Sequence, residues 1–373
     1  IHQDEHEEVE YGQDVRNAFA GADYYIRSDD DTELRESLKR FLDLVLDQPY
    51  ISPTRSEVAM AHAATAALRS ADLSRQIGAA IVARDGRVLT TGCNEVPRPG
   101  GGQYWEDDGD DQRDFKRGFD ANDLKKREAI IEIMSKLNDY FRLDLEISPA
   151  NLPQFYEKIR GRLRGTRVDN LVEFGRVVHA EMSAMNASSR DTVSIKDADL
   201  YCTTFPCHMC TRQIVDVGVR NVFYIEPYPK SAAKELFGDS IEVNPRLNPD
   251  EFKTRLLGAL DPKRRVAFIP FSGVAPRRYH ALFKNRRRKT DDGAVVDGAR
   301  KSSTPRRPPI RDLYKTIEDE ISKRLDSVVD GWKKEAELAT VPTLFDRRPE
   351  TEALPDEPAA AAAGNGEPQH GPN

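Results

Sequence analysis

The segment that decides the fold is VVHAEMSAMNASSRDTVSIKDADLYCTTFPCHMCTRQIVDVGVRNVFYI, residues 177–225. Its apolar spacing predicts a helix, a strand, a second helix and a second strand, in that order, over His179–Ala187, Asp199–Thr204, Cys207–Val217 and Asn221–Ile225. Strands that alternate with helices in this way favour a layered α/β sheet with helices on its faces.

The flanking sequence extends the same sheet on both sides. Upstream, an alanine-rich helix is expected over Glu57–Arg69, and it leads into two apolar runs, 78–83 and 87–94. The pair Asp85-Gly86 between these runs is a strong hairpin signal. Downstream, three further elements are expected: helices over 230–237 and 250–260 and a strand over 265–270. The predicted fold class is α/β, a three-layer α/β/α mixed sheet with a helical insert and extra terminal helices.

The composition of the remaining segments predicts how the chain is divided into domains. Residues 51–285 are expected to form the main domain, preceded by an acidic extension, 1–50, with an amphipathic helix over 33–47. The other expected parts are a helical insert over 105–175 with helices over 124–137 and 153–163, a flexible linker over 286–309, a C-terminal helix over 310–340 and a disordered tail over 341–373. The apolar stripe of the C-terminal helix is expected to pack against the main domain or another subunit.

Composition excludes several classes of protein. Of the 373 residues, 32 % are charged and the net charge is −7, which argues against a basic nucleic-acid coat. No apolar run approaches the ~18–20 residues of a membrane span. The opening IHQDEHEEVE lacks the pattern of a secretory signal, so a cytoplasmic protein is expected. Four cysteines are too few for a disulfide scaffold, and their clustering points to metal chemistry.

Three residues of the quoted segment match the ligand set of zinc. A catalytic zinc takes three protein ligands from thiolate and imidazole groups and leaves a fourth position for water. His179 and the pair Cys207 and Cys210 each stand where a loop enters a predicted helix, and the three-residue offset puts both sulfurs on one side of the first turn. The neighbouring His208 points away from its ligating neighbours on such a helix and is left out of the site.

Glu181 follows His179 by two residues and is placed to carry protons between water and a substrate. The combination H-x-E with P-C-x-x-C is similar to the signature of zinc-dependent base deaminases. Alone, a Cys-x-x-Cys pair is also compatible with a structural half-site or a redox pair. Cys93 and Cys202 lie in strand patterns and are interpreted as buried small apolar residues.

Two upstream strings resemble the deoxycytidylate deaminase branch of the cytidine deaminase superfamily. They are RSADLSRQIGAAIV, residues 69–82, and GCNEVPRPG, residues 92–100. The resemblance implies a cytidine-deaminase-like fold, in which Asn94 binds the sugar and Arg75 the phosphate of the substrate. Glu95 stands where glycine is usual, which leaves the number of phosphates open.

Five longer strings are similar to the bacterial anti-phage dCTP deaminases: GGGQYW, LVEFGRVVHAEMSA, TTFPCHMC, YIEPYPKS and PFSGVAPRRY. The resemblance implies hydrolytic deamination of deoxycytidine nucleotides, dCTP and/or dCMP, during infection. It also implies a homo-oligomer, and it permits a small regulatory RNA as partner. Such proteins often carry a P-loop kinase-like domain, which this sequence lacks or has in reduced form, with residues 1–50 interpreted as its remnant.

Further substrate-binding residues are expected from their positions in loops and at the ends of predicted elements. Tyr228 and Lys230 follow directly on the strand after the second ligand helix, and three loop arginines could reach a phosphate: Arg98, Arg277 and Arg278. Two rival functions stay open. A nucleic-acid deaminase acting on tRNA or single-stranded DNA would need a basic track beside the site. A catalytically silent zinc module that binds nucleotides or RNA would have no use for Glu181.

Overall fold

The computed structural model describes residues 15–28, 31–46, 50–141, 152–163, 166, 168, 171–229, 231–245, 264–284, 289–295 and 321–323. The chain divides into two compact units, 1–306 and 307–373. In the second unit only 321–323 are described, as helix, so most of the predicted C-terminal helix and all of the predicted tail lie outside the described residues. The predicted helix over 250–260 and most of the predicted linker over 286–309 lie outside them as well.

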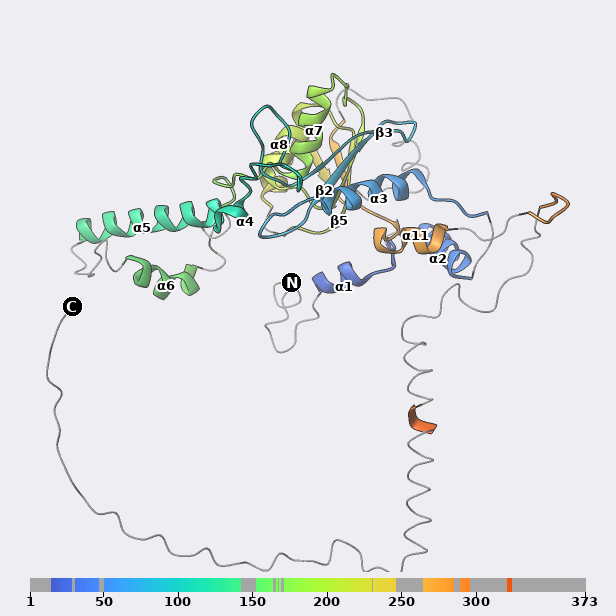
Figure 1. The fold of residues 1–373 in the computed structure, drawn as a ribbon, viewed down its shortest axis with the longest axis horizontal. Helices are drawn as coiled ribbons and strands as arrows, with labels where there is room; N and C mark the ends of the chain where they lie inside the picture. Colours follow the sequence, from blue (N-terminus) through green and yellow to red (C-terminus); the bar gives the residue numbers. More distant parts are fainter. Residues whose placement is uncertain are drawn as a thin grey trace, which may run out of the picture. The chain divides into compact units, whose positions relative to one another are not determined.

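The centre of the first unit is a six-stranded mixed sheet (Figure 1) with the strand order β3-β2-β4-β5-β7-β6. The strands are β2 (Gly78–Val82), β3 (Val88–Cys93), β4 (Asp199–Thr204), β5 (Asn221–Glu226), β6 (Ile241–Val243) and β7 (Val266–Pro270). The pairs β2–β3 and β2–β4 are antiparallel, and the remaining pairs are parallel. The predicted hairpin is confirmed, with Gly86 at a φ of 95° in its turn.

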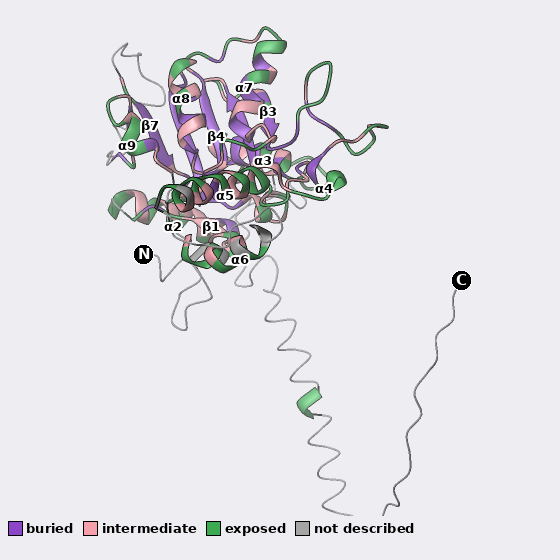
Figure 2. Ribbon diagram, turned by 90° about the vertical axis from the view of Figure 1, so that its left-hand side faces the viewer, coloured by how far each residue is buried: buried purple, intermediate pink, exposed green. Residues whose placement is uncertain are grey.

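Helices cover both faces of the sheet, which confirms the three-layer α/β/α class. Alternate side chains of β2 enter two different cores. Ala79 and Ile81 pack with α7 (Ala180–Arg190) and α8 (His208–Asp216), whereas Ala80 and Val82 pack with α3 (Arg55–Ala67). Figure 2 shows the buried strands between these helices. The α7–α8 face therefore carries every residue of the predicted metal site.

The N-terminal extension packs on the main domain through both strand pairing and apolar contacts. It contains α1 (Val15–Gly21), β1 (Tyr24–Tyr25) and α2 (Asp31–Val45), and β1 pairs antiparallel with β8 (Gly273–Val274). Leu44 of α2 lies in a small core with Val274 and Leu282 of α11 (Tyr279–Phe283). The short β1, β6 and β8 were not predicted from the sequence. The origin of residues 1–50 as a kinase-like remnant stays a prediction.

Glu57, near the start of α3, joins the extension to the main domain. Its carboxylate accepts hydrogen bonds from the backbone of Thr54 and Val274 at 2.7 and 3.0 Å and from Arg40 of α2 at 2.7 Å. The Thr54 side chain accepts in turn from the Glu57 backbone, which completes a capping box. A buried carboxylate with this many donors is structural rather than catalytic.

The predicted insert is helical, as expected. It contains α4 (Asp114–Arg117), α5 (Ala121–Phe141) and α6 (Leu152–Leu163). The guanidinium of Arg127 on α5 lies 5.3 Å from the ring centroid of Tyr156 on α6. Asn122 ties the two ends of the insert together, because its Nδ2 donates to the Leu171 carbonyl and its Oδ1 accepts from the Phe174 backbone.

Two short elements complete the described fold: α9 (Ala233–Phe237) and the 3-10 helix η1 (Pro276–Arg278). Among the described residues, no helix combines the length and apolarity that a membrane crossing requires.

Candidate metal and catalytic site

The three predicted ligands converge at the N-terminal ends of two neighbouring helices. His179 is the N-cap residue of α7 and Cys207 the N-cap residue of α8, while Cys210 lies in the first turn of α8. Nδ1 of His179 lies 3.3 Å from Sγ of Cys207 and 3.4 Å from Sγ of Cys210. The ligand atoms of all three residues lie within 4.8 Å of one another.

This arrangement fits a zinc ion. With Zn–N and Zn–S bonds of about 2.0 and 2.3 Å, tetrahedral geometry separates a nitrogen from a sulfur ligand by about 3.5 Å. The two observed nitrogen–sulfur distances are within a few tenths of an ångström of that value. Two thiolates and one imidazole also form the donor set of a catalytic zinc with one open position. His208 is outside this cluster and lies 3.5 Å from Glu173 instead.

Contacts within the cluster shift the pKa of each of its three members. The hydrogen bond from Cys210, with that from His179, lowers the pKa of Cys207 to about 4 despite its burial. The same contact with Cys207, together with burial, raises the pKa of Cys210. Burial would lower the pKa of His179, but its hydrogen bond to Cys207 and the nearby negative charges raise it to about 9. A metal that binds here displaces the protons of Cys210 and His179.

Glu181 occupies the first turn of α7, beside the cluster. It is 5 % exposed, and Sγ of Cys210 lies 3.5 Å from its Oε2. Burial, followed by the negative charge of Cys207, raises the pKa of Glu181. A carboxyl group with a raised pKa next to a metal cluster can both accept and return a proton, which is the property required of a general acid–base.

The position of α7 depends on Gly92 of β3. A Cβ atom at Gly92 would lie 2.4 Å from the carbonyl oxygen of Ala180 and 2.4 Å from the backbone nitrogen of Ala184. We therefore expect Gly92→Ala to push α7 away from the sheet and to lower zinc content and thermal stability together. Metal analysis and thermal unfolding would measure both, with Gly109→Ala as control, since a Cβ there meets open space. Unchanged zinc content in Gly92→Ala would contradict this expectation.

A cavity of about 430 Å³ opens beside the cluster. His179, Glu181 and Cys207 line it together with three predicted substrate-binding residues: Arg75, Asn94 and Tyr228. Lys230 lies outside the described residues. The other three loop arginines are absent from this lining: Arg98 pairs with Asp108, and Arg277 and Arg278 pair with Asp23.

Asn94 and Glu95 hold the loops of this cavity in place. Asn94 is buried, its Oδ1 accepts from the Ile77 backbone and its Nδ2 donates to the Arg75 carbonyl, both at 2.7 Å. The Glu95 carboxylate accepts from the backbone of Ala71 and of Val96 at 2.8 Å and does not line the cavity. The unusual glutamate therefore anchors the turn rather than facing a substrate.

Sequence reasoning missed the contribution of the insert. The insert and the residue directly after it line the cavity through six residues: Asp114, Asp120, Asn122, Val172, Gly175 and Arg176. These positions come together only through the fold, so their types and spacing carry no motif. The one available signal is the place of Arg176, three residues before His179.

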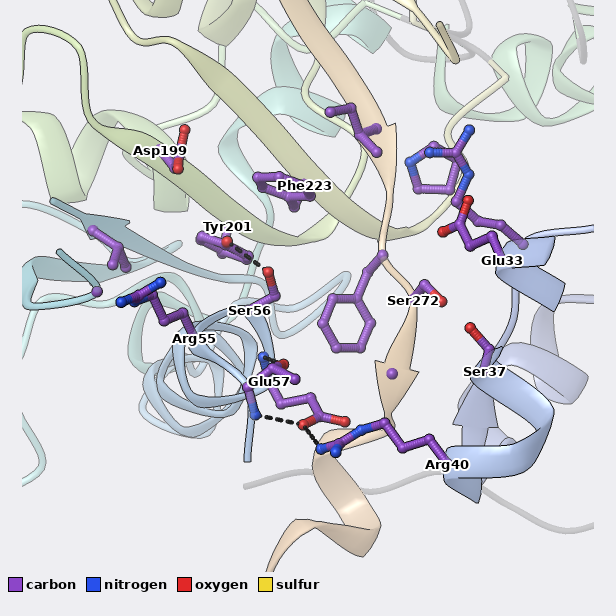
Figure 3. Close-up of a pocket in the computed structure, with 18 of the residues that line it drawn as sticks. Glu33, Ser37, Arg40, Arg55, Ser56, Glu57, Asp199, Tyr201, Phe223 and Ser272 are labelled. Atoms are coloured by element: carbon purple, nitrogen blue, oxygen red, sulfur yellow. Dashed lines mark hydrogen bonds and ion pairs between the residues drawn. The ribbon is translucent and has the colours of Figure 1, made fainter. Parts of the chain in front are cut away.

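A second cavity, of about 600 Å³, lies on the α3 face of the sheet. Figure 3 shows its wall of Tyr201 and Phe223 from the sheet, with Ser56 of α3 in hydrogen-bond contact with Tyr201 and with Arg40 reaching Glu57. None of the predicted site residues lines it. The candidate chemistry is confined to the α7–α8 face.

The described fold places a His/Cys/Cys cluster that fits zinc on one face of an α/β/α sheet. Residues 53–226 match the family model described as the cytidine and deoxycytidylate deaminase zinc-binding region. The match includes all three cluster residues and Glu181, and the donor set fits zinc. The cofactor of this domain is zinc.

Two curated relatives share part of the domain. ComE operon protein 2 of Bacillus subtilis (strain 168) is 38 % identical over 95 residues, which cover 25 % of this chain and 48 % of that protein. The deoxycytidylate deaminase of Enterobacteria phage T2 is 35 % identical over 54 residues, which cover 14 % of this chain and 29 % of that protein. The chain thus spans about half the length of the first relative and under a third of the second.

Among solved structures, the chain is similar to the dCMP deaminase from the cyanophage S-TIM5 in apo form. The match has 16 % identity and a TM-score of 0.28, and it covers 59 % of this chain and 100 % of that chain. A likeness this distant supports no conclusion about activity.

Proposed function

We propose that this chain catalyses the zinc-dependent hydrolytic deamination of deoxycytidine nucleotides, dCTP and/or dCMP, to deoxyuridine nucleotides. The observation that carries the proposal is Glu181. Its buried carboxyl group lies 3.5 Å from Sγ of Cys210, one of three metal ligands that together leave a fourth coordination position of zinc open. A purely structural zinc site needs no such group, so Glu181 argues against a silent zinc module.

When bound, zinc supplies a Lewis acid that lowers the pKa of a coordinated water toward neutrality. Glu181 takes one proton from the attacking water as its oxygen adds to C4 of the cytosine, and it delivers this proton to N3. Glu181 then carries the second proton from the new hydroxyl group to the amino group. The C4–N bond breaks, ammonia leaves and uracil remains, so water and cytosine are consumed one for one.

The cavity supports a nucleotide as the substrate. Asn94 is proposed to bind the sugar, Arg75 the phosphate, and Tyr228 and Lys230 other parts of the nucleotide. Arg75 lies 3.3 Å from Glu226, and both side chains are 29 % exposed, so this ion pair is weak enough to exchange for a phosphate. The resemblance to anti-phage deaminases suggests that the reaction depletes deoxycytidine nucleotides during infection.

The experiment that tests the proposal is a substrate panel with zinc-loaded protein. Release of ammonia and uracil is measured with dCTP, with dCMP and with a cytosine-bearing single-stranded oligonucleotide. We expect turnover of at least one free nucleotide and none of the oligonucleotide. Turnover confined to the oligonucleotide would establish the rival nucleic-acid deaminase, and no turnover of any substrate would favour the silent module. The homo-oligomer, the regulatory RNA and the cytoplasmic location stay predictions from the sequence.

A further inference from the structure

The two ends of the insert meet in an ion pair on the wall of the substrate cavity. Asp114 begins α4, and Arg176 follows the last turn of the insert, just before the metal ligand His179. Nη1 of Arg176 donates to Oδ1 of Asp114 at 2.5 Å and to the Gln112 carbonyl at 3.1 Å. Both charged residues line the cavity that also contains Arg75 and Glu181.

Asp72, another acid that lines this cavity, is already committed to its own loop. Oδ1 of Asp72 accepts hydrogen bonds from the backbone of Ser74 and Arg75 and from the Ser74 hydroxyl. Asp114 differs, because its carboxylate accepts a hydrogen bond from a distant side chain, that of Arg176. Opening the Asp114–Arg176 pair would therefore break no turn, although it would remove the bond to the Gln112 carbonyl and the partner of a largely buried carboxylate.

We propose that Arg176 is a substrate-binding residue that exchanges Asp114 for a phosphate group of the substrate, and so makes the enzyme selective for nucleotides over nucleosides. This inference rests on the proposed function, since it assigns a second cation to the substrate of the same site. The planar guanidinium can donate two parallel hydrogen bonds to a phosphate. Arg75 comes from the loop before β2 and Arg176 from the segment directly after the insert, so the phosphate is bound from two independent segments.

The exchange replaces one ion pair by another. The Arg176 side chain is 27 % exposed but that of Asp114 only 10 %, so opening the pair costs energy that the contacts of Arg176 with the phosphate must offset. A phosphate offers more negative charge and more acceptor oxygens than one carboxylate, so it competes well for the same guanidinium. Asp114 stays close to the substrate after the exchange, where its charge opposes binding of the phosphate.

The test compares Arg176→Ala, Arg176→Lys and Asp114→Asn in zinc-loaded protein. Binding and turnover are measured with deoxycytidine, dCMP and dCTP. For Arg176→Ala we expect KM and Kd for both nucleotides to rise about tenfold, as for a lost charge-assisted hydrogen bond, with kcat and the values for deoxycytidine nearly unchanged. Arg176→Lys keeps the charge and should recover part of the loss.

Asp114→Asn gives the opposite sign and distinguishes a binding role from a structural one. Removal of the competing carboxylate should tighten nucleotide binding, about threefold, and leave deoxycytidine unchanged. If the pair only holds the insert in place, both variants weaken all three ligands alike, which would overturn the inference. If nucleotides bind in an Arg176-dependent way but nothing is deaminated, the proposed function fails while the role of Arg176 stands.

Discussion

Glu181→Gln is expected to retain zinc and to lose deamination by about 10²–10⁴-fold, the usual contribution of a general acid–base group. Glutamine has nearly the same shape, so the packing of α7 and the metal cluster are preserved. It cannot take a proton from water or return one to the leaving amino group. Zinc content is measured by elemental analysis, and kcat by release of ammonia from the preferred nucleotide.

Glu57→Gln is the matched control, because it makes the same change in another buried glutamate. Glu57 lies on the opposite face of the sheet, where its carboxylate accepts from Arg40 and from two backbone groups. This variant should unfold at a lower temperature, since charged acceptors are lost, but its folded form should keep kcat. If Glu181→Gln kept its activity, the assignment of Glu181 as proton carrier would be wrong.

The fold was predictable where the sequence pattern is local. The hairpin turn, the alanine-rich α3 and the alternation of α7, β4, α8 and β5 depend on residues close together in the chain, and all of them are confirmed. The metal ligands could also be placed, because each stands at a helix start and the two helices adjoin across β4. The strands β1, β6 and β8 have two or three residues and carry too little pattern to be recognised.

The walls of the cavity could not be predicted because they depend on contacts between distant segments. Asp114 and Arg176 are 62 residues apart, and only the folded insert brings them together. Glu95 stands where glycine is usual, and the sequence therefore leaves open how many phosphates the substrate carries. In the structure its carboxylate accepts hydrogen bonds from the backbone of Ala71 and Val96. The sequence alone cannot distinguish a buried glutamate that binds backbone donors from one that faces a ligand.

Cys207→Ala is expected to lose zinc, and with it all deamination. The two remaining protein ligands, His179 and Cys210, cannot replace the lost thiolate. If each ligand of a four-ligand site supplies an equal share of its binding free energy, zinc affinity falls at least about a hundredfold. Cys202→Ala is the matched control, since Cys202 is equally buried in the same core on β4 but lies outside the metal cluster. It should cost only about 1 kcal/mol of stability through lost packing, with zinc retained. A Cys207→Ala protein that kept one zinc per chain, or a Cys202→Ala protein that lost it, would show that the cluster has been assigned to the wrong residues.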